Sequence, residues 1–532
     1  MDTDVLVVGA GPTGLMLADQ LVRRGVRVLI IDRHAGPSLQ TRALGVQART
    51  LEIYAKLGIV DRALELGKRG TGANIWALGR RTARVPLGEA GAKVTPYPYI
   101  LILGQDDNEK IMGEKLNQLG ASVQWETELV GLEQKRDQVS ATLKMPDGSS
   151  RTITTAWVGG CDGAHSSVRE LSGITFPGAP YEHVFFVADT VTTGSMVPDE
   201  VNVYLWRRGF HLLFPMRGKD HWRIVGIVPE ELRDRRDLDI EDVLPSLRSE
   251  AGAGLSIKTC MWFSTYRIHH RCASRFRDRR CFLLGDAAHI HSPVGAQGMN
   301  TGLQDAYNLA WKLALVVSGR ADKTLLDSYE AERLPVAQRL LHTTDRAFRL
   351  VVSDNWLAGL WRTKIMARLA AFAMGFRRIQ ALAFRTVSQT GIDYRRSALS
   401  EALGGLPEGA PRAGDRFPWL QLKLRPGGPV EDLFEALDDT HFNLIVIGQP
   451  SPIDAGAGLS DLLRMHVLPA DPVNDAELAR VHIPQPSFYL LRPDGHVGLC
   501  GTRLEPGAVV RYLTERVHLV RQVRDVAAQP LA

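Results

Sequence analysis

Cysteine is scarce in this chain of 532 residues: five stand at positions 161, 260, 272, 281 and 500, and no pair of them forms CxxC. Such usage gives neither a disulfide framework nor a zinc site, and it is typical of a reducing compartment. No apolar run approaches the roughly 20 residues that a membrane span needs. No basic signal-peptide segment precedes the first apolar strand. We therefore expect a soluble, cytoplasmic protein with no membrane span and no metal site.

An excess of charge of one sign is also absent. The chain has 64 basic and 59 acidic residues, a formal net charge of +5, so its mixed surface gives no case for nucleic-acid binding. Hydrophobic residues make up 45% of the sequence, which is ample for the cores of two to four domains. One local exception is WRTKIMARLAAFAMGFRRIQALAFR at 361–385, a basic amphipathic pattern that can lie on anionic membranes. Packing on a neighbouring domain is the commoner outcome for such a helix, and we expect it here.

The first residues have the order strand, glycine-rich turn, helix, strand. The apolar run from Val5 to Val8 predicts a buried parallel strand, and it leads into GAGPTG at 9–14, a GxGxxG pattern. In such a turn the first glycine permits the tight bend, the second lets the backbone approach a pyrophosphate, and the third lets helix and strand pack closely. Asp32, at the end of the second strand, is placed to accept from a ribose hydroxyl. The unit predicts a dinucleotide site that fits NAD or FAD.

Two further turns follow in which a predicted strand ends at an acidic residue beside glycine; we call these two turns and the first glycine turn corners. In the run FLLGDAAHIHSPVGAQGMN at 282–300, Asp286 emerges at the carboxyl end of a predicted strand, where ligands bind in open α/β sheets. The glycine-rich turn after it has few side chains, and a helix is predicted from about Met299 to Val317. A bare turn before a positive helix N-terminus suits a flat ring such as a flavin isoalloxazine. The run WVGGCDGAHSSVRELSG at 157–173 ends a strand at Asp162; taken alone, this corner is equally consistent with a surface turn.

Together the three elements resemble the single-component FAD-dependent aromatic monooxygenases, the p-hydroxybenzoate hydroxylase and phenol hydroxylase family. The resemblance covers residues 1 to about 345, including SYEAERLPVAQRL at 328–340. One departure is Ala296, where many larger members have glycine. The resemblance implies bound FAD, with NADPH or NADH as a transient co-substrate. It also implies hydroxylation of a phenolic or polycyclic aromatic substrate through a flavin C4a-hydroperoxide.

The resemblance further implies which residues hold the cofactor. Asp32 would bind the adenosine ribose, Asp286 the ribityl chain, and Arg42 would lie near the pyrophosphate. Gln105 would contact FAD beside the ribityl chain. The complete predicted set is Gly9, Gly11, Pro12, Thr13, Gly14, Asp32, Arg33, Arg42, Gln105, Asp162, Gly163, Gly285, Asp286, Pro293, Gly295, Gly298, Met299 and Asn300. No residue is assigned as catalytic, because no histidine stands out as a base.

Between residues 173 and 276 the pattern changes to that of a meandering antiparallel sheet. The family resemblance implies that this sheet floors a substrate cavity on the far face of the flavin. Apolar and aromatic candidates for the floor are Phe210, Leu212, Phe214, Trp222, Trp262, Tyr266 and Pro293. For each of them an ordinary core position is the alternative.

The C-terminal region begins after a Gly- and Pro-rich segment that is typical of a linker. HFNLIVIG predicts a strand, LSDLLRMHVL a short helix or turn, and QPSFYLLRPDGHVGLCG a hairpin that turns at 493–495. This order resembles the thioredoxin-like tail of larger phenol hydroxylase relatives, with Pro486 where thioredoxins hold a cis proline. Because CxxC is missing, we expect a structural or dimer-contact role, and we expect deletion after residue 410 to leave FAD bound.

The predicted fold class is α/β: a Rossmann-like FAD-binding domain with an inserted β-sheet substrate domain and a thioredoxin-like C-terminal domain. We place the FAD-binding domain at 1–172 (with an excursion at 71–99 toward the substrate domain) and 277–395, the substrate domain at 173–276, the linker at 396–418 and the C-terminal domain at 419–532. The alternatives are a Baeyer–Villiger-type or antibiotic-inactivating flavin monooxygenase and, from another class, a non-catalytic FAD-binding scaffold or sensor. The expected partners are a small aromatic substrate and O2, and a homodimer is left open.

Overall fold

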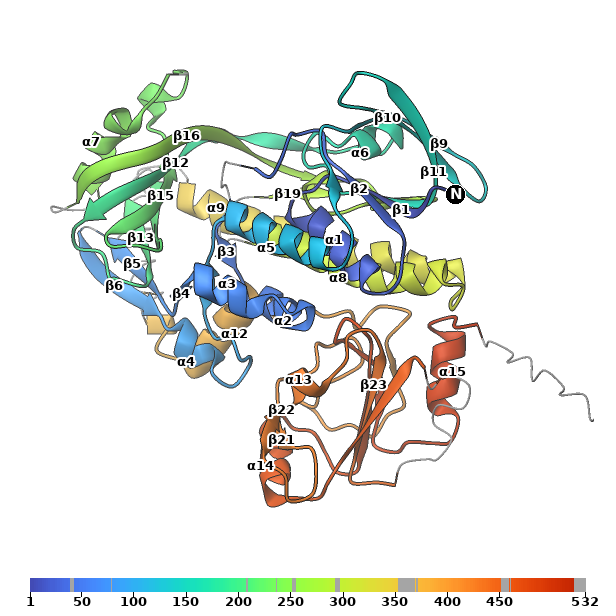
Figure 1. Ribbon diagram of the computed structural model, residues 1–532. Coiled ribbons are helices and arrows are strands. Elements are labelled where there is room, and N and C mark those ends of the chain that lie inside the picture. The colour runs from blue at the N-terminus through green and yellow to red at the C-terminus, as the bar shows by residue number, and fades with distance from the viewer. Residues whose placement is uncertain are drawn as a thin grey trace, which may run out of the picture. The chain divides into compact units, whose positions relative to one another are not determined.

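The computed structural model describes residues 1–38, 43–77, 79–206, 209–235, 237–250, 255–291, 297–352, 369, 372–450, 459 and 461–520. The chain forms two compact units, whose elements are labelled in Figure 1. The first comprises residues 1–23, 27–307 and 333–391, and the second comprises 24–26, 308–332 and 392–532. Two helices, α8 (Gly298–Val317) and α9 (Asp327–Val352), contain residues of both units.

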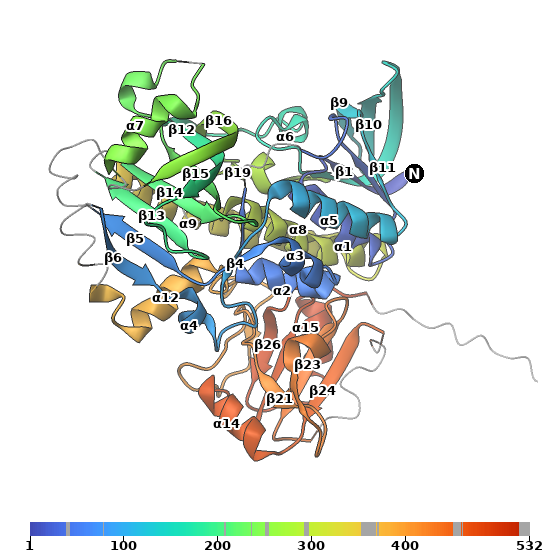
Figure 2. The same cartoon turned by 60° about the vertical axis from the view of Figure 1, so that its left-hand side comes forward.

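A mainly parallel sheet of the first unit has the strand order β17-β18-β11-β1-β2-β8, and β10 and β9 continue it from β11. Its central strands are parallel and buried, which explains their continuous apolar runs. Helix α1 contacts β1, β2 and helix α5, and both views show α1 and α5 side by side (Figures 1 and 2). The strands are β1 (Thr3–Val8), β2 (Val28–Ile31), β8 (Val123–Gln124), β9 (Glu128–Gln134), β10 (Val139–Lys144), β11 (Ser150–Gly160), β17 (Arg277–Asp278) and β18 (Cys281–Leu283).

A second sheet of the first unit has the order β19-β16-β12-β15-β14-β13-β5-β6, and its pairs are antiparallel except β13–β5. The antiparallel sheet predicted between residues 173 and 276 is confirmed, because strands β12 to β16 all lie in this sheet. Residues 73–85 supply its last two strands. The strands are β5 (Ala73–Ala77), β6 (Arg80–Val85), β12 (Gly178–Thr193), β13 (Val201–Trp206), β14 (Gly209–Pro215), β15 (His221–Ile227), β16 (Ser256–Cys272) and β19 (His289–Ile290).

Shorter elements complete the first unit. Three small strands pair in the order β3-β7-β4: β3 (Gly45–Val46), β7 (Ile100–Ile102) and β4 (Lys68–Gly70). The helices are α1 (Pro12–Val22), α2 (Ala48–Leu57), α3 (Val60–Leu66), α4 (Leu87–Gly91), α5 (Gln105–Gln118), α6 (Ser167–Leu171), η1 (Glu230–Leu232), α7 (Ile240–Glu250), η2 (Gly285–Ala287) and α12 (Arg377–Val387). In the part of the chain that the structure describes, no helix combines the length and apolar character required to cross a bilayer.

The second unit contains a five-stranded sheet of order β20-β26-β25-β23-β24. The predicted strand is β23 (Phe442–Ile447), and the predicted hairpin is β25 (Ser487–Leu491) with β26 (Val497–Gly501), so both are confirmed. The helix or turn predicted at 459–468 is wrong, because residues 463–468 form the edge strand β24, which pairs with β23 in parallel. The other elements are β20 (Glu401–Ala402), β21 (Gln421–Lys423), β22 (Val430–Asp432), β24 (Leu463–Leu468), η3 (Lys323–Leu326), α13 (Leu433–Ala436), α14 (Pro472–Arg480) and α15 (Ala508–Glu515).

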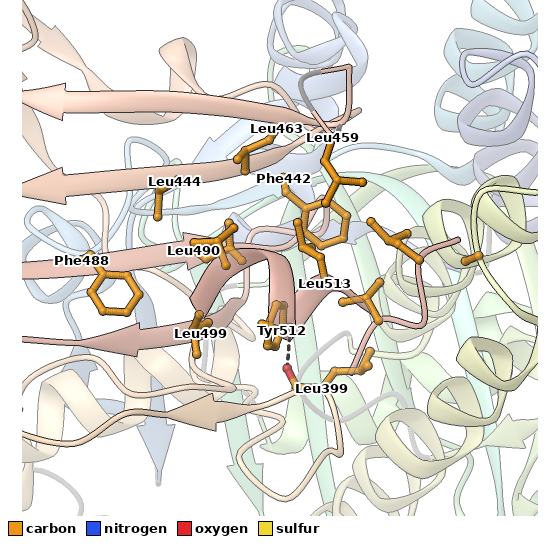
Figure 3. Packing of buried hydrophobic residues seen from close by; sticks show 14 of the residues in the cluster. Leu399, Phe442, Leu444, Leu459, Leu463, Phe488, Leu490, Leu499, Tyr512 and Leu513 are labelled. Carbon is orange, nitrogen blue, oxygen red and sulfur yellow. Dashed lines mark hydrogen bonds between the residues drawn. The ribbon is translucent and has the colours of Figure 1, made fainter. Parts of the chain in front are cut away.

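The apolar core on one face of this sheet includes side chains from the strands and from α15 (Figure 3). Leu490 and Leu499 of the hairpin pack there with Leu513 of α15. Tyr512, fully buried on α15, donates its hydroxyl proton to the carbonyl oxygen of Leu399 at 2.7 Å. Residues before and after the sheet are thus tied into the same core. The Gln485–Pro486 peptide bond is cis, at the proline where the resemblance to thioredoxins places one.

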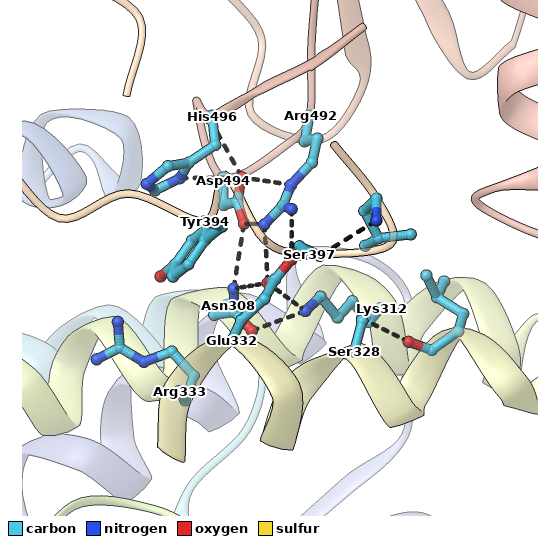
Figure 4. A network of polar contacts seen from close by, with 12 residues as sticks. Asn308, Lys312, Ser328, Glu332, Arg333, Tyr394, Ser397, Arg492, Asp494 and His496 are labelled. Atoms are coloured by element: carbon cyan, nitrogen blue, oxygen red, sulfur yellow. Dashed lines mark hydrogen bonds and ion pairs between the residues drawn. The ribbon is translucent and has the colours of Figure 1, made fainter. Parts of the chain in front are cut away.

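A buried network of charges lies in the same unit (Figure 4). The carboxylate of Glu332 accepts from Lys312 Nζ at 2.7 Å, from Arg492 Nη1 at 2.6 Å and from Ser397 Oγ at 2.6 Å. Asp494 pairs with the same Arg492, and all four charged side chains are at most 2% exposed. Burial alone would raise the pKa of Glu332, but Arg492 and Lys312 outweigh it and lower this pKa to about 2. Two cations and two anions therefore balance one another away from water.

Candidate active site

The glycine turn between β1 and α1 is constrained by the protein at two of its three glycines. Gly9 has a φ of 100°, and a Cβ on it would lie 2.4 Å from the carbonyl oxygen of Cys161. A Cβ on Gly14 would lie 1.9 Å from the carbonyl oxygen of Gly9. At Gly11, by contrast, a Cβ would meet no protein atom within 4 Å, and φ is −70°. The fold therefore requires glycine at 9 and 14, whereas the open space at Gly11 fits a phosphate that approaches the backbone.

Asp32 follows β2 and folds back on this turn. Its Oδ2 accepts from the backbone N–H of Ala10 at 2.7 Å, and its Oδ1 accepts from the backbone N–H of His34 at 2.9 Å. Asp32 is half-buried, and the neighbouring Arg33 is exposed. Asp32 Oδ1 also lies 2.8 Å from Nδ1 of His34, but each carboxylate oxygen has two lone pairs, so Oδ2 retains acceptor capacity for a ribose hydroxyl. Pro12, the first residue of α1, lacks the N–H that a helix start leaves unpaired.

The second corner follows β11 and is closed by its own acidic residue. Asp162 accepts from Ser166 Oγ at 2.5 Å and from the backbone N–H of Val168 at 3.1 Å, next to Gly163, whose φ is 74°. Burial raises the pKa of Asp162, and these hydrogen bonds partly offset the effect. Its carboxylate therefore shapes the corner and holds Ser166, whose hydroxyl accepts from the backbone N–H of Arg169 and caps the short helix α6.

The third corner, at Gly285, is brought against the first. Gly285 has a φ of 58°, and a Cβ on it would lie 2.6 Å from Thr13 Oγ1. A Cβ on Gly302 of α8 would lie 2.4 Å from the same hydroxyl and 3.0 Å from the Cα of Gly285. Asp286, the next residue, is exposed on η2. Residues 13, 285 and 302 thus meet at one point, and sequence reasoning did not single out Gly302.

Arg169 links the second and third corners. Its Nη2 donates to the carbonyl oxygen of Ala164 at 2.8 Å, and its Nη1 donates to that of Ala287 at 3.1 Å. The side chain is 6% exposed and its guanidinium lies 4.0 Å from the ring centre of Phe176. One buried cation thus connects loops that are more than 100 residues apart in the sequence.

A buried carboxylate under the third corner was also missed from sequence. Asp305 on α8 accepts from Gly285 N at 3.1 Å, from His289 Nε2 at 2.7 Å and from Arg333 Nε at 2.6 Å. Burial raises the pKa of Asp305, but Arg333 and His289 outweigh it, so the net shift is downward. Because an ionised carboxylate only accepts, the His289 Nε2 carries the proton. The segments that contain Asp305 and Arg333 carried the family resemblance, but nothing in their spacing indicated this contact.

The first turn of α8 is fixed by Asn300. Its Nδ2 donates to the carbonyl oxygen of Gly45 at 2.7 Å, and its Oδ1 accepts from Gln47 N at 2.8 Å and Thr50 Oγ1 at 2.7 Å. The side chain is fully buried. Asn300 thus holds the start of α8 against the strand and helix that follow residue 44, which positions the backbone of its neighbours Gly298 and Met299.

Gln105, at the start of α5, lies near another buried acid. Its Nε2 donates to Glu109 Oε1 at 2.8 Å, and Glu109 Oε2 accepts from Ser38 N at 3.0 Å. Burial raises the pKa of Glu109. Three predicted cofactor residues, Arg42, Pro293 and Gly295, lie outside the described residues.

One face of the second sheet collects most of the predicted substrate-floor residues. Phe210, Leu212 and Phe214 alternate along β14 and so share a face. Phe210 and Leu212 pack in one cluster with Tyr266, and Phe214 packs with Leu44 and Ile102. Trp222 points to the opposite face, where it shares a core with Val243 and Leu247 of α7.

An ion pair stands on the same face as Phe214. Arg223 Nε and Nη2 donate to the two carboxylate oxygens of Asp189, each at 2.5 Å. Strand register places Phe214 beside Arg223, and Asp189 beside Trp262. The guanidinium carbon is 5.6 Å from the ring centre of Trp262, and the Arg223 side chain is 4% exposed. This largely apolar face therefore carries a cation whose charge is already neutralised.

The glycine turn between β1 and α1, with Asp32 folded back on it, has the geometry of a dinucleotide-binding protein. A family model described as an FAD binding domain matches residues 2–344. The chain is 34% identical over 518 residues to the 6-methylpretetramide 4-monooxygenase of Streptomyces rimosus, covering 94% of this chain and 91% of that protein. It is 33% identical to the rifampicin monooxygenase of Streptomyces venezuelae, with 94% and 95% coverage. The structure of an aklavinone-11 hydroxylase in complex with FAD and aklavinone matches with a TM-score of 0.78, 25% identity and 97% and 99% coverage.

The chain belongs to the FAD-dependent aromatic monooxygenases. It is a flavoprotein oxidoreductase whose cofactor is FAD, with NAD(P)H as the reductant typical of the family. The mixed α/β fold with several sheets predicted from sequence is confirmed, as are the family and the enzyme class.

Proposed function

We propose that this monooxygenase hydroxylates an uncharged, fused-ring phenol. The observation that carries the proposal is the convergence of three glycine corners in the same unit as a largely apolar sheet face. Relatives named for pretetramide, rifampicin and aklavinone substrates favour a polycyclic substrate over a single phenol ring. The rifampicin relative keeps the antibiotic-inactivating alternative open.

The three corners fit FAD because each leaves backbone or a carboxylate oxygen open where a part of the cofactor would bind. The open backbone at Gly11 and the N-terminus of α1 would receive the pyrophosphate. Asp32 would accept from the adenosine ribose, and the exposed Asp286 would accept from the ribityl hydroxyls. The backbone around Met299, held by Asn300, would support the ring system. Gln105, Arg33, Arg42, Pro293 and Gly295 remain proposed contacts by family resemblance.

When bound, FAD supplies the chemistry that neither the side chains nor the backbone can perform: it takes a hydride from NAD(P)H and activates O2. The chain's own contribution is to bind and orient the cofactor and the aromatic ring, and to keep water from the reacting atoms. Because no nucleophile is required for this, we assign no catalytic residue.

The charge on the sheet face supports an uncharged substrate. A carboxylate on the substrate needs a cation to replace its water. Arg223, an arginine on this face, is held by both oxygens of Asp189. A second anion near Arg223 would also be repelled by Asp189. We infer that the face favours hydroxyl, keto and apolar ring atoms over carboxylates.

The proposal is tested with purified FAD-loaded protein and a panel of phenols and polycyclic phenols. Substrate-stimulated oxidation of NADPH or NADH, uptake of O2 and a product heavier by one oxygen atom are the expected results. A product with oxygen inserted into a ring carbon–carbon bond would instead indicate a Baeyer–Villiger reaction. A stable flavin spectrum with no stimulated oxidation across the panel would contradict the proposal and favour a non-catalytic FAD-binding scaffold.

For the C-terminal region we infer a thioredoxin-like domain without redox chemistry. The order β26-β25-β23-β24, with β25 antiparallel to its neighbours and α14 and α15 following β24 and β26, supports this. Burial raises the pKa of its cysteine, Cys500, to about 11, which disfavours the reactive thiolate. A structural role, including a dimer contact, is the proposal, and the mass of the protein in solution tests the dimer.

A further inference from the structure

A row of apolar side chains is exposed on α12 and the turn before it. Phe372, Phe376, Ile379 and Leu382 are 71%, 50%, 38% and 66% exposed, and the rings of the two phenylalanines touch edge-on at 5.2 Å between centres. Ile379 and Leu382 lie three residues apart on α12, Phe376 directly precedes this helix, and Phe372 lies before the turn at 374–376. We call these four residues the α12 patch. An exposed apolar patch of this size indicates a surface that binds another molecule or a membrane.

The opposite side of α12 already has its packing partner. Phe384 is 2% exposed and shares a core with Ala48 and Leu87, and α12 contacts α4 (Figure 2). Of the segment 361–385, in which packing on a neighbouring domain was expected, residues 361–368, 370 and 371 lie outside the described residues. In the described part, Phe384 packs within the first unit and the α12 patch stays bare. The helix has two apolar faces, and within the first unit one of them faces water.

Unpaired positive charge flanks the α12 patch. Arg377, Arg378 and Arg385 are exposed, and none of them forms an ion pair with any residue that the structure describes. Other exposed arginines do have such partners: Arg62 pairs with Glu65 at 2.6 Å. In the sequence, residues 355–392 contain six lysines and arginines and not one aspartate or glutamate. The patch thus combines apolar and cationic side chains with no acidic residue in its own segment.

This combination selects among the surfaces that could cover the α12 patch. In a symmetric dimer the same patch meets itself, so the arginines of both copies would approach with no carboxylate of their own segment to separate them. An anionic lipid surface instead offers phosphates to the arginines and a fluid apolar layer to a protruding row of side chains. A lipid layer also needs no preformed groove on either side.

We propose that the α12 patch docks this enzyme on anionic phospholipid membranes. Phe372, Phe376 and Leu382 enter the headgroup boundary, and Arg377, Arg378 and Arg385 contact lipid phosphates. The contact is peripheral and reversible, because a single short helix carries it. It lies outside the cofactor corners, so it is independent of the reaction proposed above.

The test is co-sedimentation of the full, FAD-loaded chain with phosphatidylcholine vesicles that either contain or lack phosphatidylglycerol. We expect binding to the anionic vesicles alone, and weaker binding as salt rises. Arg377→Glu with Arg378→Glu should reduce the partition by more than about 25-fold, since each lost arginine accounts for about five-fold. Phe372→Ser with Phe376→Ser should reduce it at least about ten-fold.

Matched substitutions elsewhere on the first unit serve as controls. Arg233→Glu removes an exposed arginine, and Met261→Ser removes a methionine that is 53% exposed. Both should sediment like the unchanged protein. All variants should retain flavin absorbance, because exposed side chains contribute little to folding.

Two outcomes would overturn the proposal. The first is equal sedimentation with and without phosphatidylglycerol, or none with either. The second is a dimer in solution that the Phe372→Ser, Phe376→Ser variant converts to monomers while vesicle binding is unchanged. That result would identify a second copy of the chain as the occupant of the α12 patch.

Discussion

Replacing Glu332 with glutamine tests the buried charge network of the second unit. The substitution keeps the shape of the side chain but removes one of two anions, so Lys312 and Arg492 are left with Asp494 alone. In the folded chain the pKa of Glu332 is lowered to about 2 from 4.5. At about 1.4 kcal/mol for each pKa unit, this shift corresponds to about 3 kcal/mol of stability at neutral pH. Breaking a buried ion pair from one side costs about 3 to 5 kcal/mol, which agrees with that value.

The assay is urea unfolding at pH 7, followed by circular dichroism, on the FAD-loaded chain. We expect Glu332→Gln to lower the free energy of unfolding by about 3 to 5 kcal/mol, a large part of the 5 to 15 kcal/mol typical of a protein. Glu431→Gln is the matched control. Glu431 pairs with Arg425 at 3.3 Å, but this pair is in contact with water, since the Glu431 side chain is 34% exposed and that of Arg425 is 75% exposed. It should change the free energy by less than about 1 kcal/mol.

The pH dependence adds a second check. Because the folded pKa of Glu332 lies below its ordinary value, its contribution is complete above pH 4.5 and is lost as the pH falls toward about 2. The difference between the two proteins should therefore shrink on acidification below pH 4.5. A loss under about 1 kcal/mol at pH 7, or a difference that grows in acid, would refute the reasoning.

Three further predictions concern the cofactor and the substrate. Gly11→Val should lower the free energy of unfolding by about 1 kcal/mol or less, because a Cβ there meets no protein atom. The same substitution should weaken FAD binding at least about ten-fold in an equilibrium titration. Equal affinity would contradict a pyrophosphate at this turn. Asp286→Ala should purify largely without flavin absorbance, and a yellow, active variant would show that the ribityl chain lies elsewhere. Asp189→Asn frees Arg223, so a carboxylated phenol should bind at least about ten-fold tighter, as measured by the change in the flavin spectrum; unaltered selectivity would exclude this face from the substrate site.

Local patterns were sufficient to predict the elements that position the cofactor. The run from Val5 to Val8, the glycines after it and Asp32 stand within 30 residues, so their roles follow from short-range geometry. The edge strand β24 was mistaken for a helix or turn because Leu463–Leu468 is only six residues long, although its residues alternate between apolar and polar. Tertiary pairing with β23 decided its conformation.

Contacts between distant residues could not be predicted. Asp494 looked like an ordinary turn residue, and nothing in the sequence indicated that Arg492 would meet Glu332, which lies 160 residues earlier. That contact also changes one expectation: deletion after residue 410 would remove Arg492 and Asp494 and leave Lys312 and Glu332 without them. We now expect such a truncation to be unstable, which a thermal melt of the shortened chain would check.

The bridge made by Arg169 has a consequence for how long a cofactor stays. One guanidinium donates to a carbonyl oxygen on each side, so parting the two loops would leave a cation stranded away from water. The two loops are therefore already ordered when the chain has folded. Little further conformational entropy is lost when FAD binds. We therefore expect FAD to stay bound through many turnovers. Exchange with free FAD should be slow compared with each catalytic cycle.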